Sequence, residues 1–157
     1  MAAIDVATTL QNCKTMWSGL AAWQAICGVA TATEAAERIY IGGTPEDTDS
    51  LVPSTVFEIA GIPLQKTGAH FRGTMDVNIW CELEVPNTNN DTYENQYLWV
   101  WSKWAALMAE MITTSNTSGG LMLESLRPVQ LPGRKDSKVN QGRKEWGFTF
   151  AFSTHLV

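Results

Sequence analysis

The last fifteen residues, RKEWGFTFAFSTHLV, alternate between large aromatic side chains and small or polar ones over most of their length. Successive side chains of a strand point to opposite faces of its sheet, so a period of two predicts a strand with one buried face. That face carries four aromatic residues, Trp146, Phe148, Phe150 and Phe152. Left uncovered, these side chains would promote aggregation, so we expect the end of the chain to be anchored in a core.

A longer alternating segment, TMDVNIWCELEV, occupies residues 74–85. Its odd-numbered positions are apolar and its even-numbered positions are mostly polar, which predicts a strand with one face on a core and the other on water or a partner. Shorter extended segments are expected at residues 39–41, 54–62 and 121–131. The last of these lies at an edge or a bulge, because Pro128 cannot donate a hydrogen bond to a sheet.

Two segments space their apolar side chains at the three- and four-residue steps of a helix. The first runs from Asp5 to Cys27, with Asp5 as its N-cap and a break expected near Ser18-Gly19. The second covers residues 92–112 and carries an apolar stripe made of Trp101, Trp104, Leu107, Met108 and Met111. A short helix is also expected after Thr31, because Thr31 and Glu34 have the spacing of a capping box.

The strands come in runs rather than in alternation with helices, which is typical of an α+β fold. We expect a mostly antiparallel sheet of four to five strands, with the two main helices packed on one face. The Trp101–Met111 stripe of the second helix would then cover the aromatic face of the last strand. Residues 1–157 fit a single domain, and a long hairpin-like arm connects the last two strands.

The composition of the chain argues against some classes of function. The formal net charge of −5 argues against a nucleic-acid-binding module, which needs a basic surface to neutralise phosphates. Charged residues make up 17% of the chain, against about 25% in ordinary soluble domains. With seven tryptophans, this indicates that part of the apolar surface belongs to an assembly. No signal-peptide pattern or membrane-spanning run is present, and the three cysteines are expected to be buried thiols.

The sequence contains no catalytic constellation. The two histidines, His70 and His155, belong to no zinc-binding pattern. The segment Gly42-Gly43-Thr44-Pro45 lacks the frame of a phosphate-binding loop and predicts a turn. We therefore expect no enzyme activity, no metal and no cofactor.

Acidic residues gather in two places. Glu46, Asp47 and Asp49 do not have the spacing of a calcium-binding loop and predict a solvated surface loop. Glu82 and Glu84 project from the polar face of the strand at 74–85. Two such acids suit acid–base chemistry, but with no pocket residue nearby in the sequence they are more typical of a solvated face.

Basic residues gather in the connection between the last two strands. Five of the eleven lie there, namely Arg134, Lys135, Lys138, Arg143 and Lys144. Two interpretations remain open. The segment is either a solvated loop or a protruding arm that docks on an acidic surface of a neighbouring subunit. In the second case the partner acids would come from Glu46, Asp47, Asp49, Glu82 and Glu84.

The order of the elements is itself informative. A helix is followed by the segment ATEAAERIYIGG leading into the first strand, the long strand GTMDVNIWCELEV, an amphipathic helix and a terminal pair of strands with an aromatic last strand. This order resembles that of the tail terminator or tail completion proteins of long-tailed bacteriophages. The resemblance covers nearly the whole chain, and the segments AAERIY and FRGTMDVNIW are the closest to family sequence.

The resemblance implies a structural virion protein without a substrate. Such proteins form hexameric rings at the head-proximal end of the tail tube, stop its polymerisation and present a surface to the head-completion or neck protein. The implied partners are further copies of this chain, the tail tube protein and the head-completion protein, in a particle assembled in the bacterial cytoplasm without a membrane. DNA would pass through the lumen without specific binding, because an acidic ring repels phosphate.

Three other hypotheses remain open at this point. A head–tail joining or stopper protein also builds a ring from small subunits. A monomeric α+β binding module and a small hydrolase or transferase that uses Glu82 or His70 are the other two. The mass of the protein in solution distinguishes the ring-forming hypotheses from the monomeric ones.

Overall fold

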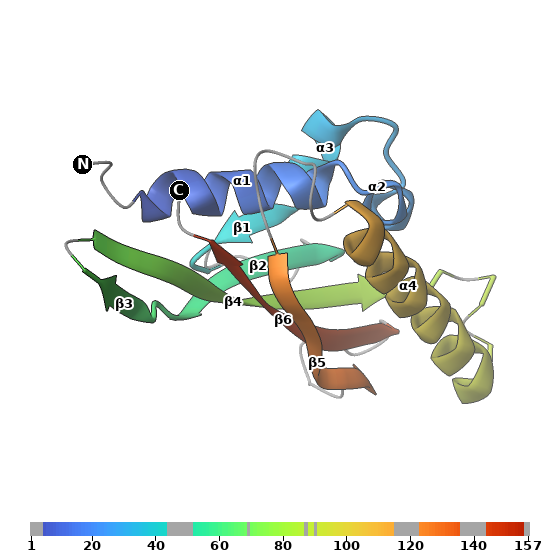
Figure 1. The fold of residues 1–157 in the computed structure, drawn as a ribbon. Coiled ribbons are helices and arrows are strands. Elements are labelled where there is room, and N and C mark those ends of the chain that lie inside the picture. The colour runs from blue at the N-terminus through green and yellow to red at the C-terminus, as the bar shows by residue number, and fades with distance from the viewer. Residues whose placement is uncertain are drawn as a thin grey trace.

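The computed structural model describes residues 5–43, 52–68, 70–86, 88–89, 91–114, 123–135 and 144–155. The helices are α1 (Val6–Ser18), α2 (Ala21–Cys27), α3 (Ala32–Ala36) and α4 (Tyr93–Thr114). The strands are β1 (Ile39–Ile41), β2 (Ser54–Gly61), β3 (Leu64–Thr67), β4 (His70–Glu84), β5 (Leu123–Arg134) and β6 (Glu145–His155). They form an α+β fold in which α1 and α4 lie on the same side of the sheet, as expected (Figure 1).

The sheet follows the order β1-β2-β4-β6-β5, and β3 pairs with β4 outside this path. β1 and β2 are parallel and the other pairs are antiparallel, so the expectation of a mostly antiparallel sheet is confirmed. The expected number of four to five strands was one too low, because β3 was missed. β3 has only four residues and follows Pro63, so it lacks a recognisable alternation, and its strand conformation depends on pairing with the start of β4.

Local capping explains where the helices begin and end. The Asp5 side chain accepts a hydrogen bond of 2.8 Å from the backbone N–H of Thr8 and starts α1. The first helical segment is broken at Gly19, as predicted, and α2 begins two residues later. α2 ends at Gly28, whose φ of 68° lies in the left-handed region that glycine adopts without strain. The short helix after Thr31 is also confirmed.

The core lies between the sheet and the helices. Register pairs such as Cys81 with Phe148 and Ile79 with Phe150 place the apolar face of β4 beside the aromatic face of β6. Trp17 of α1 packs onto this surface, with its ring centroid 6.0 Å from that of Phe57 and 6.4 Å from that of Phe150. Its indole N–H donates a 3.0 Å hydrogen bond to the Thr55 hydroxyl, so the buried polar group is satisfied.

α4 covers the other part of the aromatic face. The ring centroids of Trp104 and Phe150 are 5.7 Å apart, and those of Trp101 and Trp104 are 5.2 Å apart. Phe148 continues the series at 5.3 Å from Phe150. The prediction that the tryptophan stripe of the second main helix covers the last strand is therefore confirmed. β5 lies at the edge of the sheet and changes register beside Pro128, which is where the sequence placed an edge or a bulge.

The three cysteines are free thiols, and Cys13 and Cys81 are buried as expected, while Cys27 is half-buried. Burial raises the pKa of Cys13 and of Cys81 to about 12. Burial also raises the pKa of Cys27 to about 11, although the positive charge of Arg38 acts in the opposite direction. Because the thiolate is the reactive form, these thiols are protected in the folded protein.

Phe150 should be one of the residues on which stability depends most, because its side chain is fully buried. Changing Phe150→Ala removes most of an aromatic ring from a closely packed core, so we expect the free energy of unfolding to fall by about 3–5 kcal/mol. Urea denaturation followed by circular dichroism measures this difference. Ile112→Ala is the matched control, since Ile112 is 66% exposed and its truncation should change little.

The reactivity of each cysteine thiol should decrease with its burial. With Ellman's reagent at pH 8, Cys27 should react slowly in the folded protein, and Cys13 and Cys81 should react only after unfolding. The free energy of unfolding should also fall as the pH rises from about 8.5, where thiols of an unfolded chain ionise, towards 12. Above pH 8.5 the unfolded state has lost thiol protons that the folded state still holds. Rapid labelling of all three thiols under native conditions would contradict this account.

Candidate subunit interface

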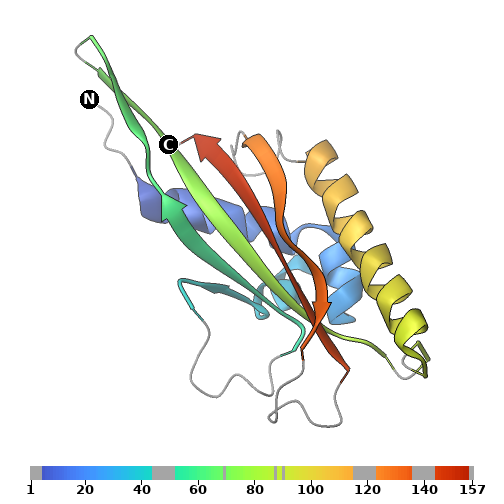
Figure 2. The same cartoon turned by 90° about the horizontal axis from the view of Figure 1, so that it is seen from below.

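The face of the sheet opposite to α1 and α4 carries the even-numbered side chains of β4 from Thr74 to Glu84. Viewed from below, the sheet lies in front of the helices, and no helix of the described residues crosses this face (Figure 2). Trp80 lies in its middle, between Val56 of β2 and Thr149 of β6 in the strand register. A 42% exposed tryptophan on an open sheet is unusual for a solvated face and is typical of a contact surface.

Two shallow depressions flank Trp80. One has a volume of about 210 Å³ and lies towards β6 and β5, where Gln130 and Thr149 line it. The other has a volume of about 220 Å³ and lies towards β2, where Val56 and Glu58 line it. Trp80 and Glu82 line both depressions, so together they form the ridge between them.

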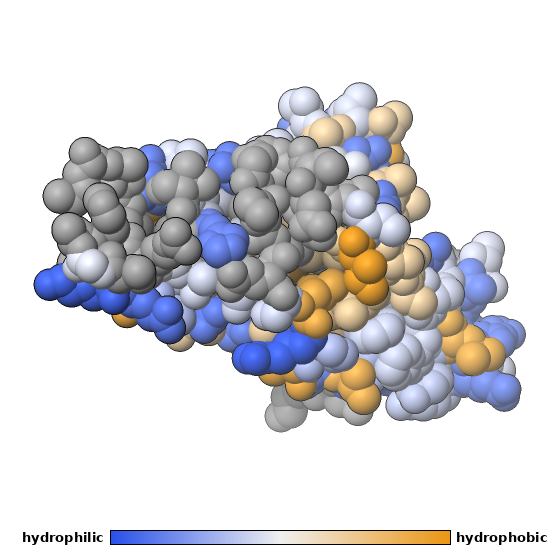
Figure 3. Space-filling view, viewed as in Figure 1, coloured by the Kyte–Doolittle hydropathy of each residue, from blue (hydrophilic) through white to orange (hydrophobic). Residues whose placement is uncertain are grey.

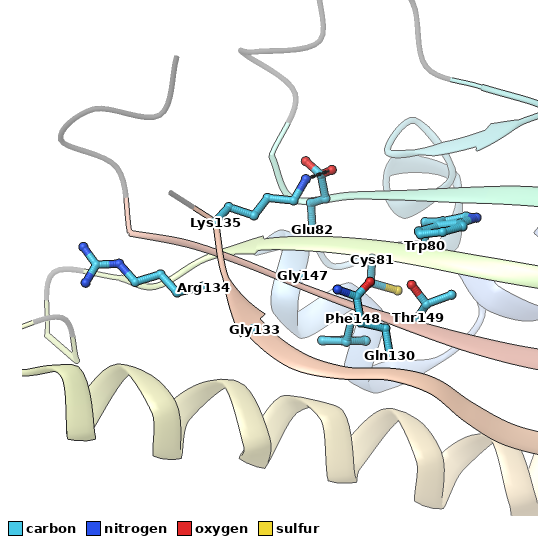
Figure 4. A pocket seen from close by; sticks show the side chains of 10 residues that line it. All are labelled: Trp80, Cys81, Glu82, Gln130, Gly133, Arg134, Lys135, Gly147, Phe148 and Thr149. Carbon is cyan, nitrogen blue, oxygen red and sulfur yellow. Dashed lines mark hydrogen bonds and ion pairs between the residues drawn. The ribbon is translucent and has the colours of Figure 1, made fainter. Parts of the chain in front are cut away.

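An ion pair crosses the sheet beside this ridge. The ammonium group of Lys135, which follows β5, binds the carboxylate of Glu82 on β4, although β6 lies between the two strands (Figure 4). Gly147 leaves room for the crossing. A Cβ atom on Gly147 would lie 3.3 Å from the Lys135 Cε and 3.4 Å from the carbonyl oxygen of Cys81. Both side chains are 39% exposed, so water and salt weaken the pair.

The residues predicted for the interface have different locations. Arg134 is the last residue of β5, and Glu84 is the last residue of β4 and is exposed. Lys144 precedes β6, and its carbonyl oxygen accepts a 2.8 Å hydrogen bond from the backbone N–H of Val85. The remaining five lie outside the described residues: Glu46, Asp47, Asp49, Lys138 and Arg143.

The structure therefore brings together one predicted acid and one predicted base, Glu82 and Lys135, within the same chain. In the docking interpretation of the sequence, both residues would contact a neighbouring subunit. The sequence alone does not pair them, because the pair depends on the register of three strands and on close packing over Gly147. Contacts between the other arm residues and a neighbouring subunit stay a prediction.

Exposed apolar side chains were missed at the sequence level. On the side of the molecule seen in Figure 3, hydrophobic residues reach the surface over α4 and β5. The exposed large apolar residues of these two elements include Leu98, Ile112, Val129 and Leu131. The signal in the sequence was the placement of Leu98 and Ile112 outside the core-facing stripe of α4. Large apolar side chains that gather at the surface are typical of protein–protein contacts.

Within the described ranges, no group of three His, Cys, Asp or Glu side chains is placed to hold a metal ion. The open face thus presents an aromatic ridge, an ion pair and shallow depressions, which together suit contact with another protein surface.

Among the described residues, no helix combines the length and the apolar character needed to cross a membrane.

Comparison with known proteins adds a likeness of fold. No protein-family model matches the sequence, and no curated protein sequence matches it. Among solved structures, a chain of the "Virion of native gene transfer agent (GTA) particle" is similar to this chain with a TM-score of 0.51 and 11% sequence identity. The likeness covers 97% of this chain and 98% of that chain. The two chains therefore share an overall fold along nearly their whole lengths.

Proposed function

We propose that this chain is a structural subunit of a phage-like particle, and specifically a tail terminator or tail completion protein. In this role it forms a ring, in a hexameric arrangement, at the head-proximal end of the tail tube. The ring ends polymerisation of the tube and presents a surface to the head-completion or neck protein. The observation that carries the proposal is the fold shared with a chain of a gene transfer agent virion over 97% of this chain.

The surface of the chain supports a role in assembly. Exposed apolar residues occur on α4, on the edge strand β5 and around β3, and the open sheet face adds Trp80. A small domain that is stable by itself has little need for this much exposed apolar surface, whereas contacts with other subunits would bury it. The net charge of −5 is also compatible with a lumen through which DNA slides without binding.

The basic arm completes the proposal. Lys138, Arg143 and Lys144 dock on a neighbouring subunit through its Glu46, Asp47, Asp49 and Glu84. Lys135 and Glu82 form an ion pair within one chain, so they fasten the base of the arm to its own sheet. Exposed ion pairs each contribute about 0–1 kcal/mol, so these contacts act together and weaken at high salt.

Ring formation is the first test. We expect the purified protein to give closed rings with six-fold symmetry in negative-stain images and a hexamer mass by light scattering. Added to growing tail tubes, it should cap one end and stop elongation. Rings that bind heads but leave tube growth unchanged would instead assign the chain to the head–tail joining proteins. Monomers at all protein concentrations, with no effect on tubes, would overturn the proposal.

A charge reversal tests the arm. Changing Lys138, Arg143 and Lys144 together to glutamate should leave the thermal unfolding midpoint nearly unchanged but prevent ring formation. Lys135 is left intact because its partner Glu82 belongs to the same chain, and Arg134 is left intact because it also has an interaction of its own. The control reverses Lys14, Lys103 and Arg127, which lie on α1, α4 and β5, and should assemble normally. Normal rings from the arm variant, with an unchanged response to salt, would identify the arm as a solvated loop.

A further inference from the structure

Two exposed apolar patches lie at opposite ends of the molecule. We call one the hairpin patch, on and just before β3, and define it by Ile62, Leu64 and Lys66. We call the other the helix patch, in the first half of α4, and define it by Tyr93, Tyr97 and Leu98. Figures 1 and 2 both place β3 and the beginning of α4 at the two extremes of the fold.

The hairpin patch belongs to a projecting element. β3 pairs with β4 alone, so beyond the end of the five-strand path the sheet continues as a two-stranded ribbon. A two-stranded hairpin is only marginally stable in water without packing on one of its faces. Leu64 is nevertheless 50% exposed, and Ile62 is exposed beside it. The ribbon therefore presents apolar side chains for which the described part of the chain provides no covering element.

The helix patch is an aromatic surface with one ring stack. The rings of Tyr93 and Tyr97 are stacked with centroids 6.3 Å apart and an interplanar angle of 20°. Both rings also contact Trp146, whose side chain is buried, so the patch rests on the core. Leu98 extends the patch outward and is 59% exposed. The result is an apolar surface whose two tyrosine rings pack against each other and against the core.

The two patches have opposite charge. Between Glu58 and Asp76 the sequence contains Lys66 and Arg72 and no acid. Around the helix patch, Asp91 and Glu94 are exposed, and residues 73–102 contain no lysine or arginine. A hydrogen bond from the Asn95 side chain lowers the pKa of Asp91, which keeps its carboxylate charged. Arg134, the cation opposite Trp146 in the strand register, is already engaged within the chain.

We propose that the hairpin patch of one copy docks on the helix patch of the next copy, and that this contact joins the subunits of the ring. The inference rests on the proposed function, because it identifies the partner of each patch as a second copy of this chain. Leu64 and Ile62 cover the tyrosine rings, and Lys66 lies against a tyrosine face and the Glu94 carboxylate.

Charge also determines the symmetry of the contact. Two hairpin patches facing each other would bring cations together, and two helix patches would bring carboxylates together, so self-pairing of either patch is repulsive. The complementary contact joins two different surfaces. Repeated from copy to copy, a contact of this heterologous kind generates a ring when the rotation closes.

Complementary charge reversals test the contact. Lys66→Glu makes the hairpin patch acidic, and Glu94→Lys makes the helix patch basic, so each variant alone should lose the ring peak in size-exclusion chromatography. In a one-to-one mixture, the altered hairpin of the first variant meets the altered helix of the second, and their unaltered patches also match. The mixture should therefore recover rings in which the two variants alternate, as an affinity tag on one of them would show by co-purification.

A second variant removes the apolar part of the contact. Leu64→Asp should abolish ring formation without changing the thermal unfolding midpoint, because the side chain is half exposed. Gln11→Asp introduces the same charge at an exposed position of α1, outside both patches, and should assemble normally.

The outcomes separate the inference from the proposed function. Rings that survive Lys66→Glu, Glu94→Lys and Leu64→Asp would overturn the hairpin contact and leave the ring itself in place. Loss of rings without recovery in the mixture would also overturn it, since complementary charge would then not be the cause. A wild-type protein that stays monomeric at all concentrations and on tail tubes would overturn both.

Discussion

The antiparallel pairing of β4 with β6 is the interaction on which the rest of the structure depends. The register runs without a break from Thr74 opposite His155 to Glu84 opposite Glu145. It places the odd-numbered apolar residues of β4 from Met75 to Leu83 on the same face as the aromatic residues of β6. A slip of one residue would turn one of these sets towards solvent, so burial and register enforce each other. α1 and α4 pack on the surface that results.

The helices are also tied to one another by a polar contact. The Glu110 carboxylate of α4 accepts hydrogen bonds of 2.6 and 2.7 Å from the backbone N–H groups of Ala21 and Ala22, at the start of α2. These groups have no partner within their own helix, and a negative charge at this end also complements the helix dipole. α2 lacks a side-chain cap of its own, so a residue almost ninety positions away supplies it.

The features that the sequence predicted are those set by local periodicity. The alternation of β4 and β6, the stripe of α4 and the caps at Asp5 and Thr31 each depend on residues only a few positions apart. β3 was not predicted, because its four residues form a strand by pairing with β4 and do not show an alternation of apolar and polar side chains.

The candidate interface was predicted less well than the fold. Trp80 and the acids of β4 could be placed on the outer face, but the partner of Glu82 depends on strand order. The exposure of Leu64 and of Leu98 depends on where the ribbon and the helix extend beyond the core, which no local pattern encodes.

Because Lys135 crosses over Gly147 to reach Glu82, the connection between β5 and β6 can change in length without disturbing the sheet. The backbone N–H of Lys135 donates a 2.9 Å hydrogen bond to the carbonyl oxygen of Glu145, and the Lys135 side chain forms the ion pair with Glu82. These contacts hold the two ends of the connection together. Once both ends are clamped, doubling the number of intervening residues adds only about 0.6 kcal/mol of closure entropy. Insertions and deletions between these anchors would leave the sheet undisturbed, whereas any side chain at position 147 would crowd the aliphatic stem of the lysine.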